Sequence, residues 1–196
     1  MKYLSKSITR WLIKRETIKI EDKELYEYAV YSLFLTVEPV VLILIIGGLL
    51  GKMIEGVAII IPFMFIRKFS GGIHAKKLWV CMLSSCALLF LAVWLVDKVD
   101  VNTFLSITVV GAAVSLIWLS PVDSENRRLS TAEKKEYKVI TFFVAIVFVA
   151  IYGVLSYTEF KVYAAGIAEG IILTAMLQIP CMVNRFWIIW EKTKKM

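Results

Sequence analysis

Apolar and polar residues alternate in long blocks along this chain. Short polar connections separate six apolar runs, at residues 28–50, 53–66, 78–96, 102–120, 139–156 and 162–184. A transmembrane helix needs about 20 predominantly apolar residues, and all runs but the second come close to that length. The pattern predicts an all-α polytopic membrane protein with six transmembrane helices.

The polar residues 1–27 precede the first run. Leu4, Ile8, Trp11 and Leu12 follow the spacing of one helical face, with basic residues between them. This spacing predicts an amphipathic helix that either lies in the lipid headgroup region or packs on the cytoplasmic ends of the spans. The segment lacks the early continuous apolar core of a cleavable signal peptide.

Composition supports a single integral membrane domain over residues 1–196. The chain is 59% apolar with a mean hydropathy of +0.75, whereas soluble domains are about 45–50% apolar. We expect an amphipathic segment at 1–27, a six-span bundle at 28–184 and a cytoplasmic tail at 185–196. The tail carries two tryptophans, which are typical of an interfacial belt.

The net charge of +7 is explained by membrane topology, by lipid contact or by an acidic partner. Lys and Arg number seven in 1–27, four in 67–77, five in 121–138 and four in 185–196, whereas the alternate connections hold only Lys52, Lys98 and Lys161. The positive-inside rule therefore predicts that both termini and the 67–77 loop are cytoplasmic. Because the charges form short clusters between apolar spans, nucleic-acid binding is not expected.

The polar break between the second and third runs holds the only histidine, His74, and Cys81 follows seven residues later. An imidazole can take the proton of a thiol and leave a reactive thiolate. The alternatives are a histidine that packs at the interface and a cysteine that serves as a small apolar residue. Seven residues of straight helix span about 10.5 Å, so a catalytic pair requires a turn near His74, which Gly71 and Gly72 permit.

Other polar residues surround this pair. Arg67, Lys68, Lys76 and Lys77 would hold an acidic peptide or lower the thiol pKa, or they serve only as positive-inside charges. A third group that orients His74 is not evident; Glu38, Asp123 and Glu125 are the candidates. Cys181 is the fallback nucleophile. Three irregularly spaced cysteines and one histidine indicate neither a disulfide framework nor a metal site, and we expect no cofactor.

The segment Arg67-Lys68-Phe69-Ser70-Gly71-Gly72-Ile73-His74-Ala75, followed by Cys81, resembles a motif of the accessory gene regulator B family. In that family the motif reads Arg-Lys-x-x-Gly-Gly-x-His-Ala-x(n)-Cys. Its members are membrane-embedded cysteine endopeptidases of Gram-positive quorum-sensing systems. The chain length, the six apolar runs and the entry Ser120-Pro121-Val122-Asp123 to the second basic loop are also similar.

The resemblance implies that His74 is the general base and Cys81 the nucleophile, and it places Arg67 and Gly72 at motif positions. It implies a propeptide substrate with an amphipathic leader, a core and an acidic tail. The enzyme would cut between core and tail, hold the core as a thioester and promote closure to a thiolactone or lactone autoinducing peptide. It further implies a homodimer in the cell membrane.

Two other functions fit the residues. In a small peptide transporter, Glu38, Glu169 and Gln178 would line a path, with His74 as a gate. In a non-catalytic membrane scaffold, the basic loops would bind a partner. Both alternatives leave Cys81 dispensable. Two glycine pairs, Gly47 with Gly51 and Gly166 with Gly170, match a small-xxx-small helix-packing pattern.

Overall fold

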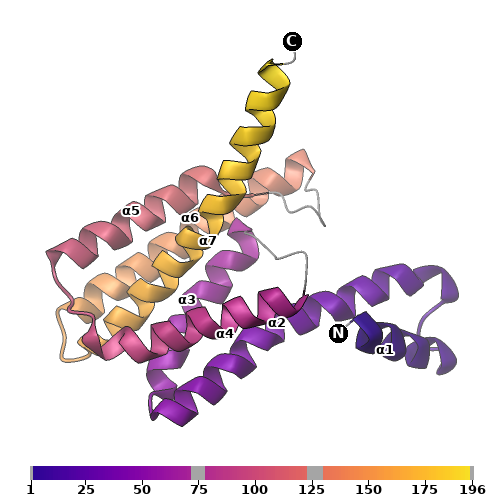
Figure 1. The fold of residues 1–196 in the computed structure, drawn as a ribbon, viewed down its shortest axis with the longest axis horizontal. Helices are drawn as coiled ribbons and strands as arrows, with labels where there is room; N and C mark the ends of the chain where they lie inside the picture. Colours follow the sequence, from indigo (N-terminus) through magenta and orange to yellow (C-terminus); the bar gives the residue numbers. More distant parts are fainter. Residues whose placement is uncertain (1, 72–77, 123–129, 195–196) are drawn as a thin grey trace. The chain divides into compact units, whose positions relative to one another are not determined.

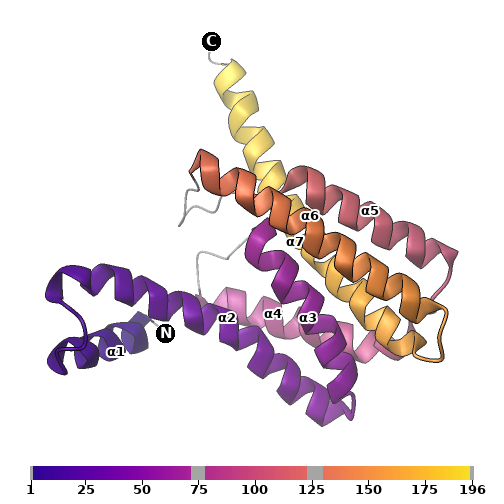
Figure 2. The ribbon, with the colours of Figure 1, turned by 180° about the vertical axis from the view of Figure 1, so that it is seen from behind.

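The computed structural model describes residues 2–71, 78–122 and 130–194, apart from the side chains of residues 2, 78, 79, 81 and 180–194 (Figures 1 and 2). These residues form helices and no strand. The α-helices are α1 (Lys2–Lys14), α2 (Lys23–Leu50), α3 (Met53–Ser70), α4 (Leu78–Leu95), α5 (Thr103–Leu119), α6 (Thr131–Ser156) and α7 (Lys161–Lys194). Short 3₁₀ turns cover Ile20–Asp22 and Val96–Lys98. The all-α prediction is confirmed, and each apolar run overlaps one helix.

The chain is a membrane protein. Three stretches of the described residues are long and apolar enough to cross a bilayer, namely Ile20–Leu50, Thr131–Ser156 and Lys161–Ile179. The helix Thr103–Leu119 is apolar but shorter. The count of six spans and the cytoplasmic side of the termini stay predictions.

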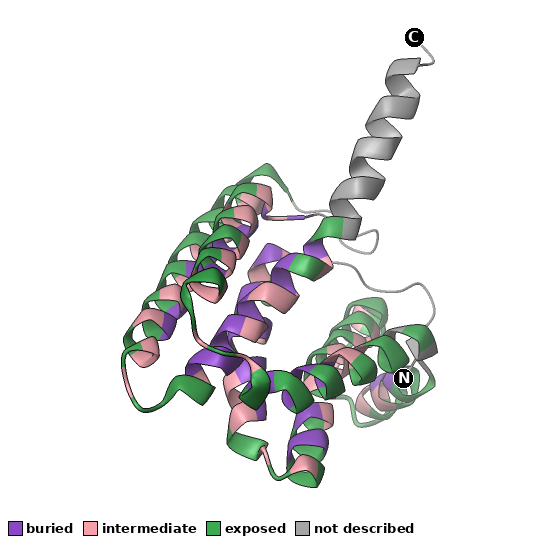
Figure 3. Ribbon diagram, turned by 60° about the vertical axis from the view of Figure 1, so that its left-hand side comes forward, coloured by how far each residue is buried: buried purple, intermediate pink, exposed green. Residues whose placement is uncertain are grey.

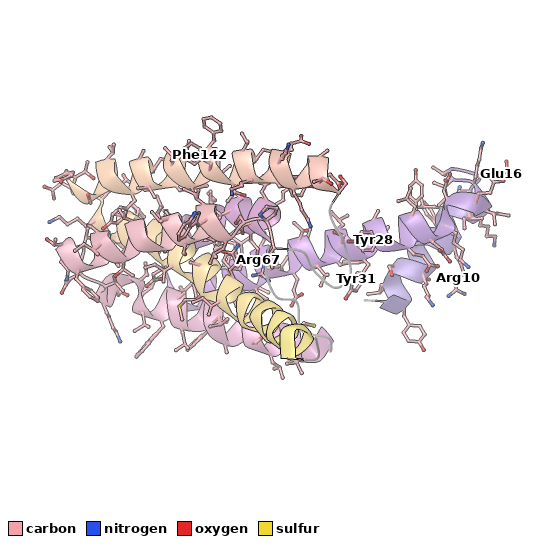
Figure 4. All side chains as sticks on the ribbon, turned by 90° about the horizontal axis from the view of Figure 1, so that it is seen from above. Arg10, Glu16, Tyr28, Tyr31, Arg67 and Phe142 are labelled. Atoms are coloured by element: carbon pink, nitrogen blue, oxygen red, sulfur yellow. The ribbon has the colours of Figure 1, made fainter. Side chains whose placement is uncertain are left out.

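The helices divide into two compact units, Met1–Leu42 and Ile43–Met196, with the boundary inside α2. In the first unit, Ser5 and Thr9 of α1 are buried, whereas Leu4 and Trp11 of the predicted apolar face are exposed. That face is therefore free, within its own unit, to meet lipid headgroups. The helix ends in a Schellman turn, in which Glu16 has a φ of 55° and Thr17 donates to the Leu12 carbonyl at 3.1 Å (Glu16 is labelled in Figure 4).

The second unit is organised around α7, which packs against α3, α5 and α6. Its face of alternating small and branched residues, Ala164, Ile167, Ala168, Ile171 and Ala175, forms one side of the core. Figure 3 shows these interior faces as buried and the outward faces of the same helices as exposed. Apolar residues that recur every three to four positions share one side of a helix, and this is the side that α7 buries in the core.

Two glycines allow α7 to approach α3 closely. A Cβ atom at Gly166 would lie 3.0 Å from the Cβ of Ala58, and one at Gly170 would overlap the Ile59 carbonyl oxygen. Small residues at such contacts let helix backbones pack in membranes. The Gly166 and Gly170 pair therefore serves the contact between two helices of this chain, α3 and α7.

Many large apolar side chains of the second unit point outward. On α5, Phe104, Ile107, Val114 and Trp118 are each more than half exposed, and the Phe142 side chain projects from α6 (Figure 4). In water such contiguous apolar surface is unfavourable. In a bilayer it is the face that meets lipid.

Two lysines lie at the end of this unit where α3 begins and α4 finishes. Lys52 forms an ion pair with Asp97 and donates to the Trp94 carbonyl at 3.3 Å. Lys98 lies 3.4 Å from the centroid of the Trp94 ring. Two of the three lysines outside the four basic clusters therefore have partners within this unit.

Candidate functional site

The predicted motif begins in the last turn of α3 and reaches the first turn of α4. Arg67 and Lys68 lie on α3, and Cys81 is the fourth residue of α4. Gly72, His74, Lys76 and Lys77 lie outside the described residues, as do Asp123 and Glu125 and the side chain of Cys81. The distance between His74 and Cys81 and the turn expected near His74 therefore stay predictions.

Gly71 ends α3 in a conformation that only glycine adopts readily. Its φ is 77° and its ψ is −169°, a region essentially closed to residues with a Cβ atom. A Cβ atom here would also overlap the carbonyl oxygen of Val122. The first glycine of the motif is thus required both by backbone conformation and by contact with the second basic loop.

The segments that lead into the two predicted basic loops meet at this end of the bundle. The Val122 amide donates to the Ser70 carbonyl at 2.9 Å. The buried side chain of Gln178, from α7, donates through Nε2 to the same carbonyl at 3.3 Å and to Ser120 Oγ at 3.0 Å. Three chain segments are therefore joined directly beside the start of the motif.

The two basic residues of α3 have different environments. Arg67, which is labelled in Figure 4, is half-buried. Its guanidinium carbon lies 5.5 Å from the centroid of the Phe63 ring. Lys68 is exposed, with its Nζ 5.4 Å from the Phe69 ring centroid. The Phe69 ring in turn meets Tyr137 of α6 edge-on, at 5.7 Å between centroids. Lys68 is thus the more accessible of the two to an anionic group.

The accessory gene regulator B (AgrB) family model matches residues 5–182 of this chain. The chain belongs to the AgrB family. Members of this family take part in quorum sensing and are associated with processing of its propeptide. The match covers every helix that the structure describes, from α1 into α7.

Relatives with curated descriptions agree with this assignment. The chain is 24% identical over 184 residues to an AgrB-like protein of Clostridium perfringens strain SM101, covering 86% of each chain. It is 24% identical over 140 residues to AgrB-like protein 2 of Clostridium perfringens strain 13, covering 64% of this chain and 65% of the relative. It is 26% identical over 121 residues to the accessory gene regulator protein B of Staphylococcus carnosus, covering 61% of each. No solved structure matches the chain.

The AgrB motif and the predicted orienting residue Glu38 lie in different units. Glu38 is on the part of α2 that belongs to the first unit, and its Oε1 has no hydrogen-bond partner among the described residues. Arg67, Lys68 and Cys81 belong to the second unit. A role for Glu38 or Asp123 in orienting His74 stays a prediction.

The remaining cysteines are separate from the motif. Cys86 is a free, exposed residue of α4, and the backbone of Cys181 belongs to α7. Among the described residues, which do not include His74, no group of three or more His, Cys, Asp or Glu side chains could hold a metal ion.

Sequence reasoning did not assign Ser70, Ser120 or Gln178 to the site. It placed Gln178 on the path of the alternative transporter. The sequence indicates the role of these residues only weakly, because single polar residues in apolar runs are common. The partners of Gln178 lie 108 and 58 residues away along the chain, and helical periodicity carries no information on such contacts.

Proposed function

We propose that this chain is a membrane-embedded cysteine endopeptidase that cleaves the acidic tail from a quorum-sensing propeptide and promotes cyclisation of the core. One observation carries the proposal: a chain of the AgrB family has its lone histidine and Cys81 in one motif, between the glycine-terminated end of α3 and the first turn of α4. The sequence contains one histidine, and Cys81 is the cysteine nearest to it along the chain.

The proposed reaction has two acyl transfers. His74 takes the proton of the Cys81 thiol, and the thiolate attacks the carbonyl carbon of the peptide bond between core and tail. The C–N bond breaks, the tail amine leaves with the proton from the imidazolium, and the core stays on Cys81 as a thioester. His74 then takes the proton of a nucleophilic side chain of the core, which attacks the thioester and closes the ring. The Cys81–carbonyl bond breaks, and the released thiolate regains its proton from the imidazolium.

Charge and placement support this substrate. Lys68, the second residue of the motif, is exposed, and Lys76 and Lys77 follow Ala75 in the sequence. Positive charges attract an acidic tail and speed its encounter with the enzyme. Under the predicted topology, the site faces the cytoplasm and meets the propeptide as it is made. A homodimer in the cell membrane of a Gram-positive bacterium is part of the same proposal.

The transporter alternative requires free polar side chains along a path. Both hydrogens of the Gln178 amide are directed to Ser70 and Ser120, so this residue serves as an internal packing contact. Glu38 and Glu169 each keep one buried carboxyl oxygen without a hydrogen-bond partner among the described residues. Two separate carboxyls give less support to a translocation path than the motif gives to an acyl transfer.

Substitution of the two motif residues tests the proposal. We expect Cys81→Ser and His74→Ala each to abolish release of the tail from a matching propeptide, while both variants accumulate in the membrane at the wild-type level. Cys86→Ser, on the same helix, is the matched control and keeps full activity. Tail release by Cys81→Ser at the wild-type rate would refute the proposal and favour the transporter or scaffold.

A further inference from the structure

A buried polar cluster lies at the point where the chain leaves α3. It consists of the carbonyl of Ser70, the hydroxyl of Ser120 and the amide of Gln178, and all three residues are buried. The cluster joins the end of α3, the segment after α5 and the middle of α7. These contacts lie within the second unit.

The hydrogen bonds of this cluster fix the end of α3. The last carbonyls of a helix have no partner inside the helix, and an unpaired carbonyl within a membrane protein is costly. The Ser70 carbonyl accepts from Gln178 Nε2 at 3.3 Å and from the Val122 amide at 2.9 Å. The helix end is thus satisfied by two segments distant in sequence.

Gln178 is suited to this contact because a primary amide has two hydrogens on one nitrogen. One is directed to Ser70 and the other to Ser120 Oγ at 3.0 Å. The Gln178 Oε1 atom has no partner among the described residues, so the contact depends on the amide nitrogen. A side chain of the same shape without N–H groups would remove the bond to Ser120 Oγ and leave the Ser70 carbonyl with the Val122 amide as its remaining donor.

The path of the chain beyond α3 depends on this cluster. Gly71 follows Ser70 and lies so close to Val122 that no Cβ atom fits between them. The chain therefore leaves α3 at a fixed place and enters the motif that contains His74 and leads to Cys81. A small displacement of a catalytic group can cost about 100-fold in rate.

We propose that Gln178 is a positioning residue of the His74–Cys81 site, which it supports by fixing the chain at Ser70 and Gly71. This inference rests on the proposed function. Gln178 does not touch the substrate in this account; it acts through the backbone that carries the catalytic pair.

The test uses the full chain in lipid nanodiscs and needs no substrate. Gln178→Met keeps the length of the side chain and removes both hydrogen bonds. Thr174→Val is the matched control, because Thr174 is equally buried one turn earlier on α7 and bonds only the Gly170 carbonyl of its own helix, at 2.8 Å. The two measurements are deuterium uptake of peptides that cover 68–82 and 120–124, and the pH profile of Cys81 alkylation by iodoacetamide.

We expect Gln178→Met to speed exchange in both peptides by about tenfold and to move the alkylation profile toward that of His74→Ala. Thr174→Val should change neither. If Gln178→Met does not accumulate, Ser120→Ala removes one of the two bonds and should give changes of the same direction. Wild-type exchange and alkylation in both variants, while His74→Ala shifts the profile, would overturn the inference.

The proposed function can fail separately. If His74→Ala leaves the alkylation profile unchanged, the His74–Cys81 pair is wrong. Deuterium uptake then still decides whether Gln178 fixes the end of α3: faster exchange in Gln178→Met supports the contact, and unchanged exchange overturns it.

Discussion

The backbone amide of Val122 donates a hydrogen bond of 2.9 Å to the carbonyl of Ser70. These residues stand at the entries of the two basic loops, which are separated along the chain by all of α4 and α5. The bond brings the loop entries together at one end of the second unit.

The first prediction concerns Gly71. We expect Gly71→Ala to destabilise this end of the bundle by about 1–3 kcal/mol, because alanine is strained at a φ of 77° and its Cβ overlaps the Val122 carbonyl. We expect the rate of tail release, measured by mass spectrometry, to fall as well. Gly111→Ala is the control, since no atom lies within 4 Å of a Cβ at that position. Equal activity in the two variants would contradict the role of Gly71.

The second prediction concerns the contact of α3 with α7. Gly170→Ala should lower thermal stability by about 1–3 kcal/mol through overpacking, because its Cβ meets the Ile59 carbonyl and the Pro62 ring. Gly153→Ala on α6 has open space and should keep the wild-type unfolding temperature. The measurement is thermal unfolding in detergent. A Gly170→Ala protein as stable as Gly153→Ala would show that the helices do not approach this closely.

The third prediction concerns pH. The hydrogen bond from Lys52 holds the pKa of Asp97 below its usual value near 4. A carboxyl whose pKa is lower in the folded state stabilises the protein above the unfolded-state pKa, and this contribution is lost as pH falls through the folded-state pKa. We expect a small loss of stability below about pH 4 that is absent in Asp97→Asn. If the free energies of unfolding of the two proteins depend on pH in the same way between pH 3 and 7, the prediction is wrong.

The fourth prediction concerns topology. In a chain without native cysteines, a cysteine at Glu159, between α6 and α7, should react with a membrane-impermeant maleimide in intact cells. One at Lys135, on the basic start of α6, should react only after permeabilisation, because positive clusters stay in the cytoplasm. Both positions are exposed, so burial does not limit labelling. Labelling of Lys135→Cys in intact cells would reverse the predicted orientation.

Much of the fold follows from the sequence because helices in membranes depend on local composition. Each apolar run became a helix, and the amphipathic spacing of Leu4, Ile8 and Trp11 became α1. Boundaries were less exact: α3 continues past residue 66 to Ser70, and α2 begins at Lys23. Polar residues at helix ends extend a helix beyond its apolar core, and a hydropathy pattern does not register them.

The same distinction between local sequence and helix packing applies to the candidate site. Its chemistry is predicted from a lone histidine, a nearby cysteine and a glycine pair, which are features of the local sequence, and it stays a prediction. Its support could not be predicted, because the contact of Gln178 with Ser70 and Ser120 depends on how α3, α5 and α7 pack. The buried face of α1 was also not predicted, since Ser5 and Thr9 are polar.

The central claim is that Cys81 becomes acylated by the core of the propeptide. The direct test incubates the reconstituted protein with a propeptide whose ring-forming residue is replaced by alanine, so that the thioester cannot close. Mass spectrometry should then find an adduct on Cys81 that is lighter than the full propeptide by the mass of the acidic tail, and none on Cys86. An unmodified Cys81, together with tail release by Cys81→Ser, would contradict the account.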